Sequence, residues 1–151
     1  KERENKKLIF ESEIKEIFYP KSKIWIEAWD ITEKIIIEIN KEITNKRKKF
    51  ILVSLSVPFQ VHPKKDYREN FQNENHIKDI FYPEKRLAQL GKKNGFKVFN
   101  LAEKLQSHAI KFNKYLHGFN NNELGKGHLN EYGHNISSEL ISNEICKLYK
   151  L

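Results

Sequence analysis

The sequence predicts an α/β fold with a parallel sheet, and three observations lead to this prediction. Segments with helical periodicity alternate with short apolar runs along the chain. The apolar run at residues 50–57 has apolar side chains on both faces, which is typical of a parallel strand covered by helices. The 151 residues are 38% hydrophobic and 12% aromatic, which suits one folded domain and excludes a disordered chain.

The N-terminal half is expected to contain two helices before this strand. A weak helical pattern covers residues 7–19. Residues 25–49 have clearer helical spacing, with Thr32 as the expected N-cap. Its expected buried stripe consists of Ile35, Ile36, Ile39 and Ile43. Residues 59–81, after the strand, form a long polar stretch to which no helix or strand is assigned.

The C-terminal half is expected to contain three helices and a second strand. A helix begins at Pro83, whose missing N–H group would be unpaired at the first helical position in any case. The strand at residues 96–99 leads into a helix at residues 101–115, where Leu101, Leu105, Ala109 and Phe112 keep a helical period. Asn130 is the expected N-cap of the last helix. The inner face of that helix is expected to carry Ile136, Leu140, Ile141, Ile145 and Leu148.

Composition limits the partners that we expect. The net charge of +8 comes from 28 basic and 20 acidic residues, but the lysines are scattered along the chain, so we do not expect a nucleic-acid partner. No apolar run approaches the roughly 20 residues of a membrane span. Cys146 is the only cysteine, and His108 and His117 have no partner at metal-ligand spacing, so we expect neither a metal nor another cofactor. The sequence indicates neither an oligomeric state nor a compartment.

Residues 125–134, Gly-Lys-Gly-His-Leu-Asn-Glu-Tyr-Gly-His, carry the clearest indication of chemistry. The glycines beside His128 permit tight turns that expose its imidazole, and the helix that follows fixes its position. An imidazole, with an ordinary pKa of about 6.5, suits a general base at neutral pH. The alternative is a loop histidine that only packs or caps. Another histidine, His62, is interpreted as a surface loop residue, with lining of a substrate cleft as the alternative.

This block resembles the C-terminal catalytic-histidine block of the SGNH (GDSL-type) hydrolases, in the branch that reads roughly Gly-His-Trp-Asn-Glu-x-Gly-His. The resemblance extends over residues 25–148, in the order that the branch uses. It includes the helix-opening residues 28–33, the strand at residues 50–57, the helix from Pro83, and residues 95–101. The resemblance implies a flavodoxin-like three-layer α/β/α fold and serine-dependent chemistry on a small acyl-ester or acylated-glycan substrate.

The resemblance also assigns roles by position. In the family a Ser from a Gly-Asp-Ser block attacks the acyl carbon and passes its proton to the His of the last block. His128 then corresponds to the general base, and Asn130 and His134 to supporting residues. The sequence has no Gly-Asp-Ser block. Ser56 comes nearest to a substitute nucleophile, although we interpret it as a small packed residue. Glu123 is the candidate for an orienting acid, and a Ser–His pair without an acid is the alternative.

Two strands are too few for a sheet with helices on both faces, so either the sequence contains strands that its pattern does not reveal or the remaining strands lie outside it. We expect the nucleophile to lie upstream. The chain opens on Lys1 without an initiator Met, in keeping with this expectation. The predicted organisation is an N-terminal segment, residues 1–24, followed by residues 25–151 as the C-terminal part of one SGNH-like esterase, acylhydrolase or acyltransferase domain. The alternatives are a non-catalytic relative that keeps the fold and a basic α/β module that binds an anionic partner.

Overall fold

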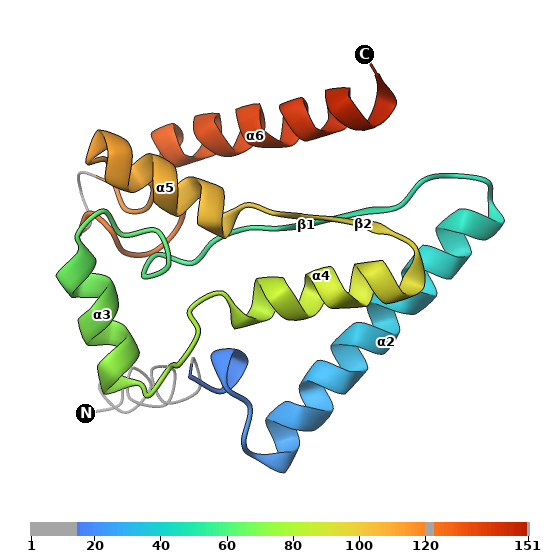
Figure 1. Cartoon of the computed structure of the whole chain (residues 1–151), viewed down its shortest axis with the longest axis horizontal. Helices are drawn as coiled ribbons and strands as arrows, with labels where there is room; N and C mark the ends of the chain where they lie inside the picture. The colour runs from blue at the N-terminus through green and yellow to red at the C-terminus, as the bar shows by residue number, and fades with distance from the viewer. Residues whose placement is uncertain (1–14, 120–122, 151) are drawn as a thin grey trace. The chain divides into compact units, whose positions relative to one another are not determined.

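The computed structural model describes residues 15–119 and 123–150, a mixed α/β structure with a two-stranded parallel sheet (Figure 1). Its elements are α2 (Lys23–Asn45), β1 (Ile51–Ser54), α3 (Lys65–Glu74), α4 (Tyr82–Asn94), β2 (Lys97–Asn100), α5 (Ala102–Phe112) and α6 (Glu131–Tyr149). Residues 15–18 are also helical, whereas residues 7–14 of the first predicted helix lie outside the described residues. The helix and strand content agrees with the predicted α/β class, and the predicted parallel pairing of two strands is confirmed.

Two compact units make up the described chain. The first takes residues 15–51 and 71–97, and the second takes residues 52–70 together with the described residues after 97. Within the first unit α2 packs against α4, and within the second α5 packs against α6 (Figure 1). No helix in the described part of the chain combines the length and the apolar character needed to cross a membrane.

The observed N-cap of helix α2 lies ten residues before the predicted one. This N-cap is Ser22, whose hydroxyl oxygen accepts a hydrogen bond from the backbone N–H of Trp25 at 3.4 Å. Thr32 lies inside the helix and donates its hydroxyl hydrogen to the carbonyl of Ala28 at 2.8 Å. The prediction of Thr32 as the N-cap was therefore wrong. Burial of Trp29 stabilises the helical turns before Thr32. This burial depends on tertiary packing, which the local sequence pattern does not show.

The apolar stripe of α2 is only partly covered. Ile36 and Ile43 are half-buried, whereas Ile35 and Ile39 are exposed at 54% and 43%. The prediction was wrong for these last two residues. A helix that packs against one neighbouring helix buries a narrow face, and the stripe is wider than that face.

Helix α3 lies within the long polar stretch at residues 59–81. Its residues, Lys-Asp-Tyr-Arg-Glu-Asn-Phe-Gln-Asn-Glu, include none that is buried, and its two apolar side chains, Tyr67 and Phe71, lie one turn apart. Two apolar residues are too few to predict a helix in an otherwise polar stretch. Asp66 in its first turn and the ion pair between Lys65 and Glu69, at 3.2 Å, favour the helix.

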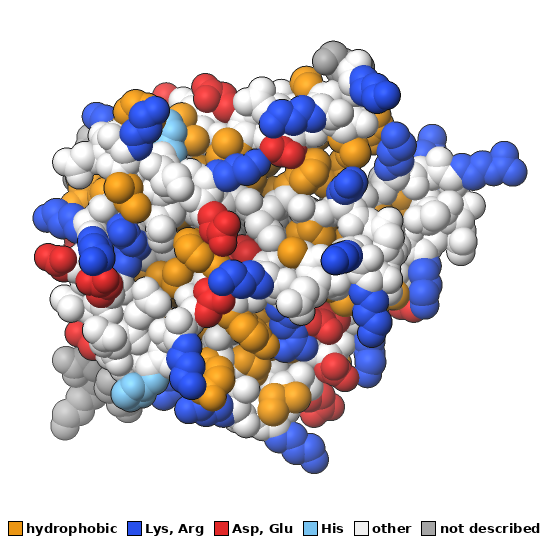
Figure 2. All heavy atoms as spheres, in the orientation of Figure 1, with side chains coloured by type: hydrophobic (Ala, Val, Ile, Leu, Met, Phe, Trp, Pro, Cys, Tyr) orange, Lys and Arg blue, Asp and Glu red, His pale blue; other side chains and the backbone are white. Residues whose placement is uncertain are grey.

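Charged side chains of both signs are interspersed on the face of the molecule shown in Figure 2. In the first unit Lys46 binds Glu42 at 2.7 Å, and in the second Lys104 binds Glu144 at 2.7 Å. Such pairs neutralise basic side chains locally, which agrees with a scattered rather than a gathered positive charge.

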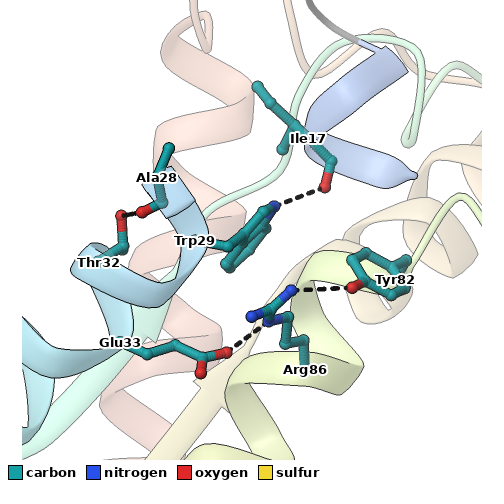
Figure 3. Close-up of polar contacts among 7 residues, drawn as sticks. All are labelled: Ile17, Ala28, Trp29, Thr32, Glu33, Tyr82 and Arg86. Atoms are coloured by element: carbon teal, nitrogen blue, oxygen red, sulfur yellow. Dashed lines mark hydrogen bonds and ion pairs between the residues drawn. The ribbon is translucent and has the colours of Figure 1, made fainter. Parts of the chain in front are cut away.

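A polar cluster joins α4 to α2 around one tryptophan (Figure 3). The indole N–H of Trp29 donates to the carbonyl of Ile17 at 3.2 Å. The guanidinium of Arg86 lies 4.7 Å from the Trp29 ring, donates through Nε to Glu33, and donates through Nη1 to the hydroxyl of Tyr82 at 3.0 Å. The side chains of Arg86 and Glu33 are only 24% and 21% exposed, so solvent screens this ion pair less than it screens surface pairs.

The core of the second unit combines the loop after β1, helix α5 and the segment before α6. Its buried members are Val61, Leu101, Leu105, Ala109, Leu116 and Leu129, and Val53, Ile136, Leu140 and Ile141 pack against them. Phe112, the last apolar residue in the predicted helical period, is 49% exposed. It is the last residue of α5 and packs along the surface against the ring of His108, 4.6 Å away between ring centres.

Candidate functional site

The histidine loop, residues 125–130, leads directly into α6. Gly125 and Gly127 adopt positive φ angles of 85° and 75°, which residues with a side chain rarely take. Between these turns and the N-cap of α6, Asn130, the imidazole of His128 is exposed to solvent. The loop therefore presents the imidazole of His128 on a locally constrained backbone.

Asn130 anchors the end of this loop through four hydrogen bonds. Its side-chain oxygen accepts from the N–H of Gly133 at 2.8 Å, which confirms the predicted N-cap. Its side-chain nitrogen donates to the carbonyls of Tyr115 at 3.0 Å and Gly118 at 3.1 Å. Its backbone N–H donates to the carbonyl of Leu116 at 3.0 Å. Asn130 is thus both the cap of α6 and the link between α6 and the segment that follows α5.

That segment, residues 116–118, runs beside the histidine loop. His117 and Leu129 form an isolated antiparallel bridge. The backbone N–H of Gly118 donates to the carbonyl of His128 at 3.0 Å. The peptide group that follows the Cα of His128 is therefore held by the neighbouring segment.

His117 connects the loop to the end of β1. Its Nδ1 lies 2.9 Å from the carbonyl oxygen of Gly127, and because a carbonyl only accepts, Nδ1 carries the hydrogen. In the neutral ring Nε2 is then an acceptor, and the hydroxyl of Ser56 donates to it at 3.3 Å. Burial lowers the pKa of His117, and the nearby His128 and His134 lower it further. The hydrogen bond to Gly127 raises the pKa but does not outweigh them, so the ring is neutral at pH 7.

The position of Ser56 places the histidine loop relative to the sheet. Ser56 lies two residues beyond the end of β1, and the backbone N–H of Leu101, just after β2, donates to the carbonyl of Ser54 at 3.1 Å. The carboxyl ends of both strands therefore lie near His117 and the loop it contacts. Open α/β sheets bind their ligands outside this edge.

The other candidate residues occupy different surroundings. Glu123 is exposed, and its carboxylate binds the ammonium of Lys126 at 2.8 Å. In the described part of the chain no carboxylate is hydrogen-bonded to the ring of His128. The side chain of His134 is exposed in the first turn of α6, and its backbone N–H donates to the carbonyl of Asn130 at 2.9 Å. The roles assigned to Glu123 and His134 stay predictions.

His62 also lies against the histidine loop, which sequence reasoning missed. It is 6% exposed, stacks on Tyr67 with 3.9 Å between ring centres, and meets the edge of Tyr115 at 5.1 Å. Burial lowers its pKa, against a hydrogen bond from the backbone N–H of Lys64. A side chain at Gly125 would come within 2.7 Å of its ring. The interpretation as a surface residue was wrong, because Tyr115, distant in sequence, covers the ring.

A hollow of about 350 Å³ adjoins the histidine loop in the second unit. Its lining combines apolar and aromatic side chains with amides and a carboxylate: Gly118, Phe119, Leu124, Asn130, Glu131, Tyr132 and Asn135. Over residues 15–119 and 123–150, no three His, Cys, Asp or Glu side chains gather closely enough to hold a metal ion. The chemistry that this region offers is therefore that of the imidazole and its hydrogen-bonding neighbours.

Comparison of the chain with protein-family models, with curated proteins and with solved structures finds no match in any of the three. Function is therefore inferred from the sequence block and from the geometry of the histidine loop.

Proposed function

We propose that this chain is the C-terminal part of an SGNH-type serine esterase, acylhydrolase or acyltransferase with the flavodoxin-like three-layer fold of that family. His128 is the general base for a Ser that lies upstream, outside the 151 residues. One observation carries the proposal. The exposed imidazole of His128 projects from an anchored, glycine-flanked loop beside the carboxyl end of a parallel strand, where α/β proteins bind ligands.

The proposed reaction begins with the neutral ring of His128. An unprotonated ring nitrogen accepts the hydroxyl proton of the upstream Ser while the Ser oxygen bonds to the acyl carbon. The ester C–O bond then breaks, and the imidazolium returns the proton to the leaving alcohol. Water, or an acceptor alcohol in a transferase, attacks the acyl-serine by the same proton route. The acyl group passes to that oxygen and the Ser is regenerated.

The base is proposed to work in a Ser–His pair rather than in a triad. Glu123, the candidate acid, already neutralises Lys126 at 2.8 Å. The position of His128 is instead supported through its backbone, by hydrogen bonds to the peptide carbonyls on both sides of its Cα.

The adjoining hollow supports the substrate class. A volume of about 350 Å³ lies within the range of small-molecule sites. Tyr132 and Phe119 offer ring surfaces for an acyl chain or a sugar face, and the amide of Asn135 offers a polar partner for hydroxyl groups. A small acyl ester or an acylated glycan has both kinds of surface.

The test is an esterase assay on the full-length gene product with p-nitrophenyl acetate. His128→Ala should lower kcat/KM by at least about 10³-fold, as removal of a base does in serine hydrolases. His76→Ala, which removes an exposed histidine of the first unit, is the matched control and should leave kcat/KM within about three-fold. Equal activity of wild type and His128→Ala would reject His128 as the base. A wild type without esterase activity would favour the non-catalytic alternative.

A further inference from the structure

We infer that His117 is the positioning residue for the base, and that its hydrogen bond to the Gly127 carbonyl, braced by Ser56, fixes the backbone from which the His128 side chain projects. This inference rests on the proposed function, because it takes His128 as the base. It assigns a role to a buried Ser–His contact that the proposed reaction does not otherwise use.

Both peptide groups that flank the Cα of His128 are held by one short segment. The carbonyl of Gly127 accepts from Nδ1 of His117 at 2.9 Å, and the carbonyl of His128 itself accepts from the N–H of Gly118 at 3.0 Å. Because peptide groups are planar, fixing the two groups fixes φ and ψ at His128, and with them the direction of its Cβ.

Gly125 and Leu129 are buried on either side of this point, but packing does not hold Gly127 itself, where the hydrogen bonds do. Gly127 is exposed, and a Cβ built on it would meet no atom within 4 Å. Its φ of 75° is a turn conformation that a freely moving glycine would leave readily. The bond from His117 is the contact that ties this peptide to the protein interior.

The ring of His117 is itself held from the opposite side. It is 4% exposed, and Ser56, which is 7% exposed, contacts its Nε2 just beyond β1. The next residue, Gly118, has a φ of 84°, and a Cβ there would lie 2.4 Å from the carbonyl oxygen of Glu123. The segment therefore fits its surroundings closely, and the connection from the sheet to His128 passes through buried groups.

Two amide substitutions separate the two contacts of this ring. The side-chain nitrogen of Asn reaches about the position of Nδ1, and that of Gln reaches about the position of Nε2. His117→Asn can therefore keep a donor for the Gly127 carbonyl. His117→Gln can keep a partner for Ser56 but loses that donor.

The kinetic test uses the full-length gene product and p-nitrophenyl acetate. His117→Gln should lower kcat by about 10- to 100-fold with KM within about two-fold, because a displacement of about 1 Å at a reacting group costs up to about 100-fold. His117→Asn should restore kcat to within about three-fold of wild type. Equal losses in both variants, or no loss in His117→Gln, would overturn the inference. Ser56→Ala should cost less than about ten-fold, and a loss as large as that of His128→Ala would identify Ser56 as a nucleophile and overturn it as well.

Amide hydrogen exchange in the full-length gene product gives a readout that needs no activity. His117→Gln should speed exchange at the Gly118 amide, the donor to His128, by at least about ten-fold relative to the core amide of Leu105. His117→Asn should not. If this pattern holds while His128→Ala keeps full activity, the proposed function fails and the anchoring of the loop stands. If His128→Ala is inactive and Gly118 exchange is unchanged, the positioning role fails alone.

Discussion

Gly133→Ala is a substitution for which helix propensity and tertiary structure predict opposite signs. Gly133 lies in the first turn of α6, where Ala would be favoured over Gly by about 1 kcal/mol. In the structure, however, a Cβ at this position would lie 2.2 Å from the carbonyl oxygen of Leu116 and 2.9 Å from Cδ2 of Leu129. A backbone carbonyl cannot rotate away like a flexible side chain, so α6 and the segment at residues 115–118 must separate.

The magnitude follows from what that separation disrupts. Overpacking of a close contact costs about 1–3 kcal/mol. The bonds from Asn130 to Leu116 and Tyr115 cross the same contact and contribute about 0.5–1.5 kcal/mol each. After subtraction of the propensity gain of about 1 kcal/mol, we expect the free energy of unfolding to fall by about 1–5 kcal/mol. At an m-value of about 2 kcal/mol/M, the urea midpoint falls by about 0.5–2.5 M.

Urea unfolding followed by circular dichroism measures this change. Ser142→Ala is the matched control, because it also introduces Ala into α6 but at an exposed position. Its free energy of unfolding should change by no more than about 0.5 kcal/mol. An unchanged or higher midpoint for Gly133→Ala would refute the close approach of α6 to Leu116 as the reason for Gly at this position.

Three further predictions use other contacts. Gly125→Ala and Gly127→Ala both place a side chain at positive φ, at a cost of about 1 kcal/mol, but only the side chain at residue 125 meets the ring of His62. In urea unfolding, Gly125→Ala should therefore lower the free energy of unfolding by about 1–3 kcal/mol more than Gly127→Ala, and equal losses would contradict the contact. Burial lowers the pKa of His62 and His117, so as the pH falls the unfolded chain binds these protons before the folded chain does. The free energy of unfolding should therefore be full above about pH 7 and should decline below about pH 6.5, through the lowered folded pKa values. Urea midpoints measured from pH 8 to pH 5 test this, and a flat profile would contradict it. Arg86→Lys should lower the free energy of unfolding by about 1–2 kcal/mol, measured by thermal or urea unfolding. An ammonium cannot donate to Glu33 and Tyr82 together while it also contacts the Trp29 ring, as the guanidinium does. An unchanged free energy would show that Arg86 contributes nothing beyond its charge.

The sequence predicted elements best where local chemistry decides them. Helix α4 has Pro83 in its first turn, as predicted, and Gly95 ends the helix with a φ of 74°. The prediction was wrong where tertiary burial decides, as for Thr32, which lies inside α2. It missed α3 because only two apolar residues mark that helix in an otherwise polar stretch.

For the candidate site, the sequence by itself determined a local unit: two glycine turns, a histidine and the Asn130 cap that starts α6. These features depend on neighbours within about four residues along the chain, so the local sequence is enough to predict them. Only the tertiary structure decided that Ser56 and His117, 61 residues apart, share a hydrogen bond, and that the other ring nitrogen of His117 holds the peptide before His128. The physical reason is that such a contact depends on how the end of a strand and two distant loops meet in space, and no local pattern of residues encodes that meeting.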